Sequence, residues 1–403
     1  MKSALKGILR FFLISVVELV ASQSQSAFYY EHWCGGELQY LDDRLCAKLF
    51  PRKLDRDFSC RAQKLASSDS PSSFEEIVRE VDETSLLSVL SPPSKDEELD
   101  LCVILSSENG SYAYYCYGST SVRIPRETWS SSKIFSVANA AGKLRETESK
   151  PTCGLGLDSS VLVRESRQWL PLGDLMTIVS SYDKTANYTS NSLSSYFNDV
   201  GFRERLAESV LHDWFGAPTD FSLGGNYGEP TPSNLSFDLD GCHIDEDTPT
   251  TAYANSLSVL AAAEMLRRIV LHRQIAPELR FPGVKWKDVQ EILYGAGEQS
   301  FFFPGQAWGG MSADPAIFVQ SALEARNVSF NDPEGHWRIF SKLGAGYSSS
   351  RQVGEIWTSA YTCMPGGVEF IVVARGSVAS DPTLVAAQRV VKRAVDEAIA
   401  WIV

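Results

Sequence analysis

Trp129-Ser130-Ser131-Ser132-Lys133-Ile134-Phe135 is the stretch that decides the fold, because it places a serine three residues before a lysine at the start of a helical pattern. Apolar residues then recur every three or four positions and predict one buried helix face; they are Ile134, Val137, Ala138, Ala141 and Leu144. Residues i and i+3 share a helix face, so the Ser130 hydroxyl and the Lys133 ammonium can point into one pocket. A lysine desolvated there loses its proton more easily and can take one from serine.

The spacing alone is a weak signal. Ser-x-x-Lys also occurs at Ser3–Lys6 and Ser181–Lys184 of this serine-rich chain. A solvated helix start is therefore the alternative interpretation of Ser130 and Lys133, and the flanking segments must decide between the two.

The composition and the first residues limit the classes of protein to which this chain can belong. The chain has 403 residues and a net charge of −13, which predicts a globular protein without a nucleic-acid or anionic-membrane role. Residues 1–26 have a basic start, a short apolar run and small residues near Ala21, the pattern of a secretory signal. The run is too short to span a bilayer, so we expect a secreted protein with no stable membrane anchor.

Eight cysteines fit an exported, disulfide-bonded chain: Cys34, Cys46, Cys60, Cys102, Cys116, Cys153, Cys242 and Cys363. No Cys-x-x-Cys pair and no histidine pattern occurs, so we expect neither a metal nor a cofactor. Glycosylation sequons are consistent with a secreted glycoprotein; they lie at Asn109, Asn187, Asn234 and Asn327.

The first elements along the chain are an extension and a hairpin. Residues 27–98 form an N-terminal extension with one predicted helix, Phe74 to Leu90, and no chemistry. Leu101 to Ser107 and Ser111 to Tyr117 are β-rich around a Glu-Asn-Gly turn. This register sets Cys102 opposite Cys116 and predicts a disulfide across the hairpin.

Helices follow, and strands return near the C-terminus. Helical patterns are predicted at Leu172–Tyr182, Ser192–Phe197, Arg203–Trp214, Thr251–His272 and Trp286–Tyr294. Strands are predicted at Trp337–Lys342, Glu355–Thr362 and Val368–Ala374, and a final helix is capped by Asp381. We therefore predict an α+β fold, an α/β/α sandwich: residues 99–125 and 337–403 build one antiparallel five-stranded sheet, and the helical residues 126–336 are inserted.

A second signal lies at the predicted end of the first of these strands, where a lysine is followed by two glycines. Lys342-Leu343-Gly344-Ala345-Gly346 brings a positive charge and bare backbone, at Gly344 and Gly346, to a ligand edge. Together with Ser-x-x-Lys, this resembles the penicillin-recognising serine hydrolases, class A β-lactamases and DD-peptidases, in which Ser-x-x-Lys, Ser-x-Asn and Lys-Thr-Gly occur in this order. The resemblance covers residues ~99 to 403. Leu343 stands where that family has threonine.

The family's second motif is similar to Ser181-Tyr182-Asp183-Lys184-Thr185-Ala186-Asn187. The resemblance implies that Ser181 relays protons to the leaving group near Lys342, and that Asn187 is buried and unglycosylated. Asp183 replaces an amide by a carboxylate that only accepts hydrogen bonds. A competing triplet, Tyr253-Ala254-Asn255, resembles the class C motif and offers Tyr253 for the same role.

Further site residues follow from the same resemblance. Glu229-Pro230 is similar to the class A loop whose glutamate activates water against the acyl-enzyme, with a turn residue as the alternative. Arg351 and Arg375 are candidates for pairing with a substrate carboxylate, although we expect each to be solvated.

Two functions remain open from the sequence. The first is a secreted, monomeric serine hydrolase in which Ser130 attacks an amide, ester or β-lactam carbonyl of a small-molecule or peptide acyl substrate. Lys133 is its base, and the oxyanion hole is formed by the Ser130 N–H and an N–H of the strand after Gly346. The second is a non-catalytic secreted glycoprotein that uses the same scaffold for ligand binding.

Overall fold

In a computed structural model of the chain, the structure describes residues 55–57, 60, 71–107, 111–146, 155–181, 187–236, 238–239, 242–243, 252–304, 309–314, 316–328 and 336–403. These residues belong to one compact unit, Pro51–Val403. The predicted signal segment, residues 1–26, and Asp183 lie outside the described residues.

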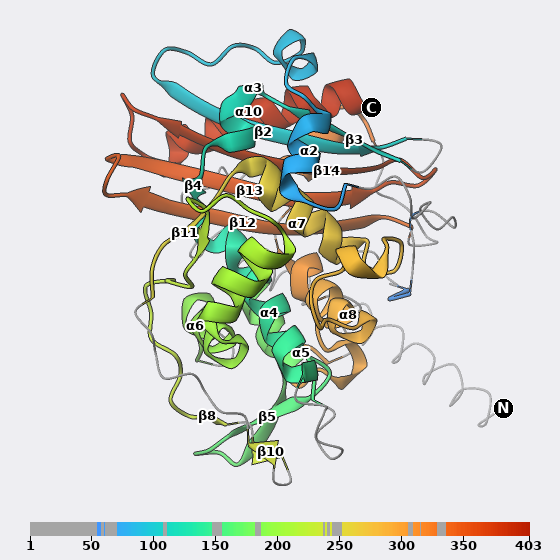
Figure 1. Cartoon of the computed structure of the whole chain (residues 1–403), viewed down its shortest axis with the longest axis vertical. Coiled ribbons are helices and arrows are strands. Elements are labelled where there is room, and N and C mark those ends of the chain that lie inside the picture. The colour runs from blue at the N-terminus through green and yellow to red at the C-terminus, as the bar shows by residue number, and fades with distance from the viewer. Residues whose placement is uncertain are drawn as a thin grey trace, which may run out of the picture. The chain divides into compact units, whose positions relative to one another are not determined.

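The central sheet joins the two ends of the described chain (Figure 1). Its order is β1-β3-β2-β14-β13-β12. The strands are β1 (Val81–Asp82), β2 (Glu97–Ser106), β3 (Tyr112–Cys116), β12 (Arg338–Ser348), β13 (Val353–Cys363) and β14 (Glu369–Val378). The five long strands pair antiparallel, as the sequence predicts, whereas the two-residue β1 pairs parallel with β3 and makes the sheet mixed.

The hairpin β2–β3 has the predicted register. Cys102 pairs with Cys116 across the two strands, and their sulfurs form a disulfide. The disulfide prediction is therefore confirmed, while the turn residues 108–110 lie outside the described residues.

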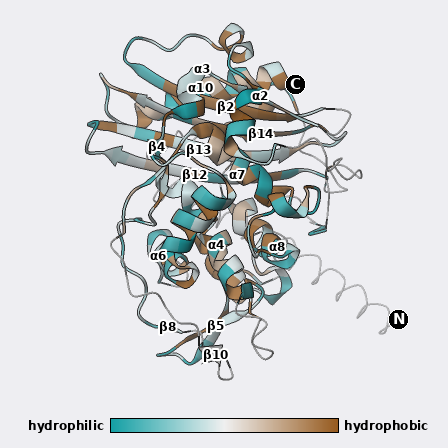
Figure 2. Cartoon of the chain, viewed as in Figure 1, coloured by the Kyte–Doolittle hydropathy of each residue, from teal (hydrophilic) through white to brown (hydrophobic). Residues whose placement is uncertain are grey.

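Helices cover both faces of the sheet. Every residue of β13 and nearly every residue of β14 is buried, which requires packing on each side because neighbouring side chains point to opposite faces. On one side, α10 (Leu384–Ile402) packs so closely that a Cβ at Gly376 would lie 3.0 Å from Val390 and Val391. Figure 1 shows α10 above the sheet and the helical block below, and hydrophobic residues concentrate in the sheet and in the block's interior (Figure 2).

The helical block begins at the predicted place. The 3₁₀ turn Trp129–Ser132 leads into α4, whose predicted apolar face is fully buried. The main helices are α4 (Lys133–Glu146), α5 (Leu172–Ser181), α6 (Ser190–Gly201), the π-helix Arg205–Trp214, α7 (Val259–Val270), α8 (Trp286–Tyr294) and α9 (Ile317–Glu324). Shorter helices are α2 (Phe74–Glu80), α3 (Gly118–Arg123) and the 3₁₀ turns Ser85–Ser88, Pro277–Leu279, Gly297–Gln299 and Gly310–Ala313.

Three small sheets surround this block. One consists of β4 (Arg126–Glu127), β11 (Asn255–Leu257) and β7 (Ser222–Leu223). The others are β6 (Gln168–Pro171), β5 (Ser160–Val163) and β8 (Leu235–Ser236), and the pair β10 (Cys242–His243) and β9 (Asp238–Leu239). Since β4 precedes Ser130 directly, the first of these sheets fixes the entry to the Ser130 turn.

Several predicted boundaries differ from the structure, and four of them change how the fold is understood. The helix expected from Thr251 starts only at Val259, because Asn255–Leu257 pair as β11 and Ser258 caps the helix with its hydroxyl. The helix expected over Phe74–Leu90 ends at Glu80, where the chain turns into β1. The cap of α10 is Thr383, and Asp381 instead accepts hydrogen bonds from Thr383.

The fourth wrong boundary is the end of the strand expected at Lys342. Strand β12 continues to Ser348, so that Lys342, Gly344 and Gly346 all pair with β13. Lys342 therefore lies inside a strand and not at its end.

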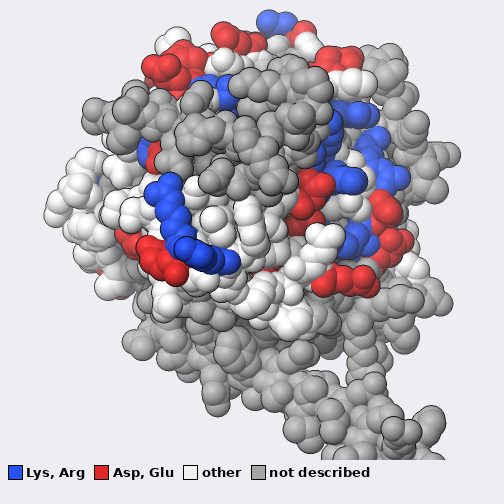
Figure 3. Space-filling view, turned by 90° about the horizontal axis from the view of Figure 1, so that it is seen from below, with Lys and Arg blue, Asp and Glu red and all other residues white. Residues whose placement is uncertain are grey.

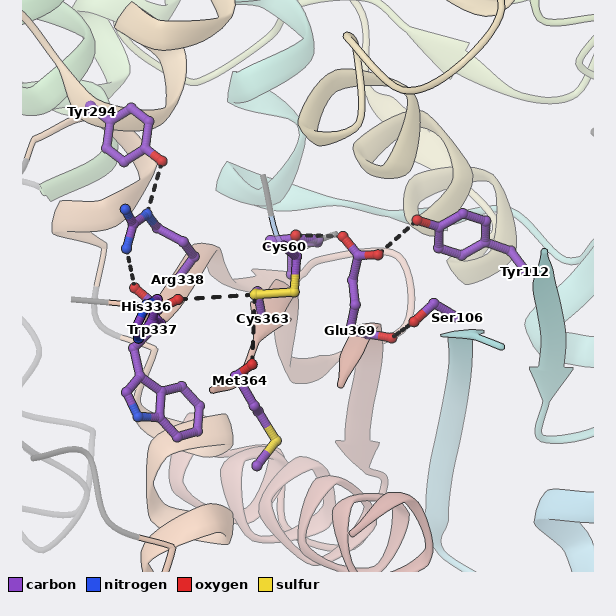
Figure 4. Close-up of a disulfide and its surroundings, with 11 residues drawn as sticks. Cys60, Ser106, Tyr112, Tyr294, His336, Trp337, Arg338, Cys363, Met364 and Glu369 are labelled. Carbon is purple, nitrogen blue, oxygen red and sulfur yellow. Dashed lines mark hydrogen bonds between the residues drawn. A yellow bond between two sulfur atoms is a disulfide. The ribbon is translucent and has the colours of Figure 1, made fainter. Parts of the chain in front are cut away.

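A second disulfide ties the start of the described chain to the sheet. Cys60 is bonded to Cys363 at the end of β13, over a sequence separation of 303 residues (Figure 4). Nearby, Arg56 donates hydrogen bonds to the Gly295 carbonyl (2.6 Å) and to Glu291 (3.2 Å). This part of the predicted extension is thus held on the main body by a disulfide and by hydrogen bonds.

The described surface mixes charges of both signs. On the face seen in Figure 3, acidic and basic side chains lie beside one another in small groups. Ion pairs such as Arg205–Glu146 (2.6 Å) occur among the described charged residues. No helix among the described residues is long and apolar enough to cross a membrane.

Candidate active site

The turn that carries Ser130 has a strained backbone. Trp129 has a φ of +51°, in the left-handed region that bulky side chains rarely adopt. Such a conformation persists only where the surroundings fix it. Here the Trp129 indole packs on β12, where a Cβ at Gly346 would lie 2.1 Å from the ring. Gly346 is therefore needed so that Trp129 can hold the turn.

Of the three consecutive serines, Ser130 is the one that faces a cavity. Ser131 is buried and shares a hydrogen bond of 2.7 Å with Ser359, and Ser132 is buried and donates to the Trp129 carbonyl (3.1 Å). Ser130 is only partly buried and lines a cavity of about 350 Å³. The fold thus presents one hydroxyl of the triplet to a ligand.

The cavity lies between the turn, the sheet edge and a loop of the helical block. Its lining residues come from β4, the turn, α6, the loop after β7, β11 and β12; they are Glu127, Trp129, Ser130, Asn191, Asn226, Tyr227, Gly228, Asn255, Ala345 and Gly346. A volume of this size suits a small ligand.

Lys133 lies one turn after Ser130 and is completely buried. Its ammonium donates hydrogen bonds to the Ser190 hydroxyl (2.9 Å) and to the Asn191 side-chain carbonyl (2.6 Å). It also lies 5.5 Å from the centre of the Tyr227 ring. Burial, together with the charge of Lys342, lowers the pKa of Lys133 well below its usual range, while the carboxylates of Glu229 and Asp314 oppose that shift.

Two hydrogen-bond partners of Lys133, Ser190 and Asn191, were not expected from the sequence. Ser181 is buried at the end of α5 and is not among the residues that line the cavity. Asn187 is exposed, so its predicted burial is wrong. Thr189, Ser190 and Asn191 instead open α6 and bring two side chains to the lysine.

A local signal could have indicated this segment. Thr189 and Ser192 form a reciprocal capping box, so the Thr-Ser-Asn triplet occupies the start of a helix. Polar side chains at a helix start point away from the helix body and can reach a neighbouring helix. In sequence alone, the segment at Ser181 matches the second motif of the resembled family more closely than the segment at Thr189 does.

Glu229 acts electrostatically on Lys133, although it is not among the residues that line the cavity. Its carboxylate accepts hydrogen bonds from the Asn191 amide (3.2 Å) and from the Thr189 hydroxyl. Its backbone carbonyl accepts from the Ser195 hydroxyl on α6 (2.7 Å), which fixes the loop. Asn191 therefore links the lysine to the carboxylate.

The edge strand β12 packs directly on the Ser130 turn. A Cβ at Gly344 would lie 2.7 Å from the Thr128 carbonyl and 2.9 Å from the Ser131 nitrogen, so only glycine allows this approach. The Leu343 N–H donates to Asp314 (3.1 Å) and hence points away from β13. Since strand N–H groups alternate between the two edges, the Ala345 N–H points the same way, beside the cavity that Ala345 lines.

Lys342 is buried next to Asp314, a residue that no sequence pattern singled out. Its ammonium donates to the Asp314 carboxylate (3.0 Å) and to the Leu343 carbonyl (3.2 Å). Burial lowers the pKa of Lys342, and the adjacent carboxylate opposes the shift. The charge of Lys342 acts on the pKa of Lys133, so the two amines lie within electrostatic reach of each other.

The remaining candidate residues, Tyr253, Arg351 and Arg375, do not line the cavity. Tyr253 is 46% exposed and is not a lining residue, although Asn255 of the same triplet is. Arg351 forms ion pairs with Glu98 and Glu355. Arg375 is fully buried and also pairs with these two acids, so its expected solvation is wrong.

No family model and no curated protein matches this sequence. Among solved structures, the chain is similar to a class A β-lactamase from Mycobacterium abscessus, with 15% identity, 79% of this chain and 98% of that chain covered, and a TM-score of 0.45. It is also similar to β-lactamases from Xanthomonas campestris (14%, 81% and 98%, 0.42) and Sphaerobacter thermophilus (11%, 80% and 98%, 0.45). The likeness concerns the fold, and the roles of individual residues depend on the site geometry.

Proposed function

We propose that this protein is a serine hydrolase in which Ser130 attacks the carbonyl carbon of an amide, ester or β-lactam. The observation that carries the proposal is the pairing of one cavity-facing hydroxyl, Ser130, with a buried lysine one turn away whose pKa is lowered. Neighbouring Ser131 and Ser132 are buried and hydrogen-bonded, so they do not compete for the role.

The acylation step follows from these contacts. Neutral Lys133 takes the Ser130 proton as the oxygen bonds to the carbonyl carbon. The carbonyl oxygen becomes an oxyanion, for which the N–H groups of Ser130 and Ala345 are the proposed donors. When the tetrahedral intermediate collapses, Lys133 returns the proton to the leaving nitrogen or oxygen, and an ester on Ser130 remains.

Deacylation is assigned to Glu229. Its carboxylate takes a proton from a water molecule that attacks the ester carbon, and the proton returns to the Ser130 oxygen as the ester bond breaks. The hydrogen bonds from Thr189 and Asn191 hold the carboxylate beside the lysine and support this role.

We also propose secretion. Two disulfides join described cysteines, Cys60 to Cys363 and Cys102 to Cys116, which suits an oxidising compartment. The signal-like residues 1–26 support the same proposal from the sequence.

A fluorophosphonate probe tests the nucleophile. We expect covalent labelling of the wild-type protein and none of Ser130→Ala. The matched controls are Ser131→Ala and Ser132→Ala, which remove buried hydroxyls of the same triplet and should still be labelled. Labelling that survives Ser130→Ala, or a folded wild-type protein that is not labelled at all, would favour the non-catalytic ligand-binding alternative.

A further inference from the structure

The cavity contains one carboxylate that the proposed chemistry does not use. Glu127, at the end of β4, is the only charged residue among the described residues that line the cavity. Among the described residues, its carboxylate has no hydrogen-bonding or ion-pairing partner. It lies two residues before Trp129, on the segment that enters the strained turn.

Lys342, Arg351 and Arg375, the cations that the sequence offers to a substrate carboxylate, are already paired with acids. The Lys342 ammonium lies 3.0 Å from the buried Asp314 carboxylate. Arg351 pairs with Glu98 and Glu355, and Arg375 pairs with the same two acids. An anionic substrate group would therefore have to compete with existing ion pairs for each of these cations.

The two edge-strand residues that line the cavity, Ala345 and Gly346, carry no side-chain hydroxyl. Leu343 and Ala345 flank Gly344 on β12 and offer a substrate only backbone groups. Leu343 is buried as well. The part of the strand that lines the cavity thus lacks polar side chains that would bind a carboxylate.

The charges around Glu127 also favour a bound cation over a bound anion. Burial and the negative charge of Glu355 raise the pKa of the Glu127 carboxyl, and Arg351 opposes this shift. Arg351 is itself paired with Glu355, so its effect on Glu127 is reduced. A cation placed beside Glu127 would pair with its carboxylate and offset the repulsion from Glu355.

We propose that the cavity selects acyl substrates that carry a positively charged amine or guanidinium group, and that Glu127 binds that group while Ser130 attacks the carbonyl. This inference rests on the proposed hydrolase function and names its substrate class. The edge of the Trp129 ring, another lining residue, provides an apolar surface for the part of the substrate that joins the carbonyl to the cation.

Three matched esters test the preference. The probes are p-nitrophenyl 4-(aminomethyl)benzoate, 4-methylbenzoate and 4-carboxybenzoate, which have similar sizes and carry a positive, zero and negative charge. With rates corrected for uncatalysed hydrolysis, we expect kcat/KM of the wild-type protein to be about tenfold higher for the cationic than for the neutral ester, and lowest for the anionic one.

Glu127→Gln keeps the shape of the side chain and removes its charge. We expect it to bring the cationic and neutral esters to within about twofold of each other while leaving the neutral ester unchanged. The control is Glu75→Gln, an exposed carboxylate on α2 that should change none of the three rates. A wild-type protein without the cation preference, or a preference that survives Glu127→Gln, overturns the inference and leaves the hydrolase proposal intact.

A binding measurement separates the two proposals. Ser130→Ala protein is titrated with 4-methylbenzylammonium and 4-methylbenzoate, and we expect about tenfold tighter binding of the cation, lost when Glu127→Gln is added. If no ester is hydrolysed but this Glu127-dependent binding is observed, the hydrolase proposal fails and the charge selectivity stands. Equal binding of the two ions overturns the selectivity whatever the kinetics show.

Discussion

Replacing Asp314 by asparagine tests how the buried ion pair behind the cavity is maintained. Asparagine has the same shape and can keep both contacts of the carboxylate: its amide oxygen accepts from the Leu343 N–H, now at 3.1 Å, and its NH2 group donates to the Ser341 hydroxyl, now at 2.9 Å. What the substitution removes is the negative charge 3.0 Å from the Lys342 ammonium, in a site where both side chains are fully buried. Lys342 must then lose its proton or remain charged without a counterion.

The size of the effect follows from the pKa of lysine. Holding the amine neutral at pH 7, against an ordinary pKa of 10.5, costs about 5 kcal/mol at about 1.4 kcal/mol per pH unit. Removing one partner of a buried pair typically costs about 3–5 kcal/mol. We therefore expect Asp314→Asn to lower the free energy of unfolding at pH 7 by about 3–5 kcal/mol.

The loss should shrink as the pH rises. In the variant, the unfolded chain binds a proton on Lys342 that the folded chain has given up, so raising the pH toward 10.5 stabilises the variant relative to the wild type. Urea unfolding of both proteins between pH 7 and pH 10, followed by tryptophan fluorescence, measures the difference at each pH. We expect it to fall by about 1.4 kcal/mol per unit.

A second aspartate provides the control. Asp396 pairs with Lys392 on α10, and both side chains are partly exposed. Asp396→Asn should cost less than about 1 kcal/mol because solvent screens the pair. The reasoning is refuted if Asp314→Asn costs no more than this control, or if its cost does not depend on pH.

Three further predictions follow from the buried and cross-linked groups. Burial raises the pKa of Glu291 to about 8, so the folded chain retains a proton that the unfolded chain loses above pH 4.5. In urea unfolding, Glu291→Gln should therefore raise the free energy of unfolding by about 3 kcal/mol at pH 7 and by little at pH 4. An equal gain at both pH values contradicts this. Replacing Cys60 and Cys363 by serine should lower the free energy of unfolding by about 2–5 kcal/mol, because their bond closes a separation of 303 residues, and an unchanged denaturation midpoint argues against it. If Lys133 is the base, kcat/KM for ester acylation should rise with pH and reach its midpoint well below pH 10.5. Glu229→Gln removes a negative charge that raises the pKa of Lys133, so it should move that midpoint to lower pH. A shift of the midpoint to higher pH counts against the assignment.

Much of the fold could be predicted from local patterns. The alternation in the strands and the three-and-four spacing after Ser130 specified the hairpin, α4 and the C-terminal strands, because each pattern reports which side of one element is buried. The boundaries that failed depend on partners elsewhere in the chain. Residues 255–257 resemble the start of a helix until β4 and β7 are available to pair with them.

The residues of the candidate site also fall into two groups: those that a local sequence pattern indicates and those that depend on distant partners. Ser130, Lys133, Glu229 and Lys342 could be identified because their spacing or flanking residues match a known chemical pattern. Asn191 and Asp314 could not, since each gains its meaning only from a lysine distant in the sequence. Glu127 belongs with them, because nothing around it in the sequence indicates an unpaired carboxylate in a cavity.

The sequence by itself determined the order of the elements, the Cys102–Cys116 pairing and the serine and lysine that share a helical turn, since all three depend on residues close together in the chain or on one strand register. Only the tertiary structure decided that Ser131 and Ser132 are buried while Ser130 lines a cavity, which side chains hold the buried lysines, and which carboxylate remains unpaired. Burial and ion pairing are set by what packs against a residue, and those neighbours come from segments that lie up to hundreds of positions away.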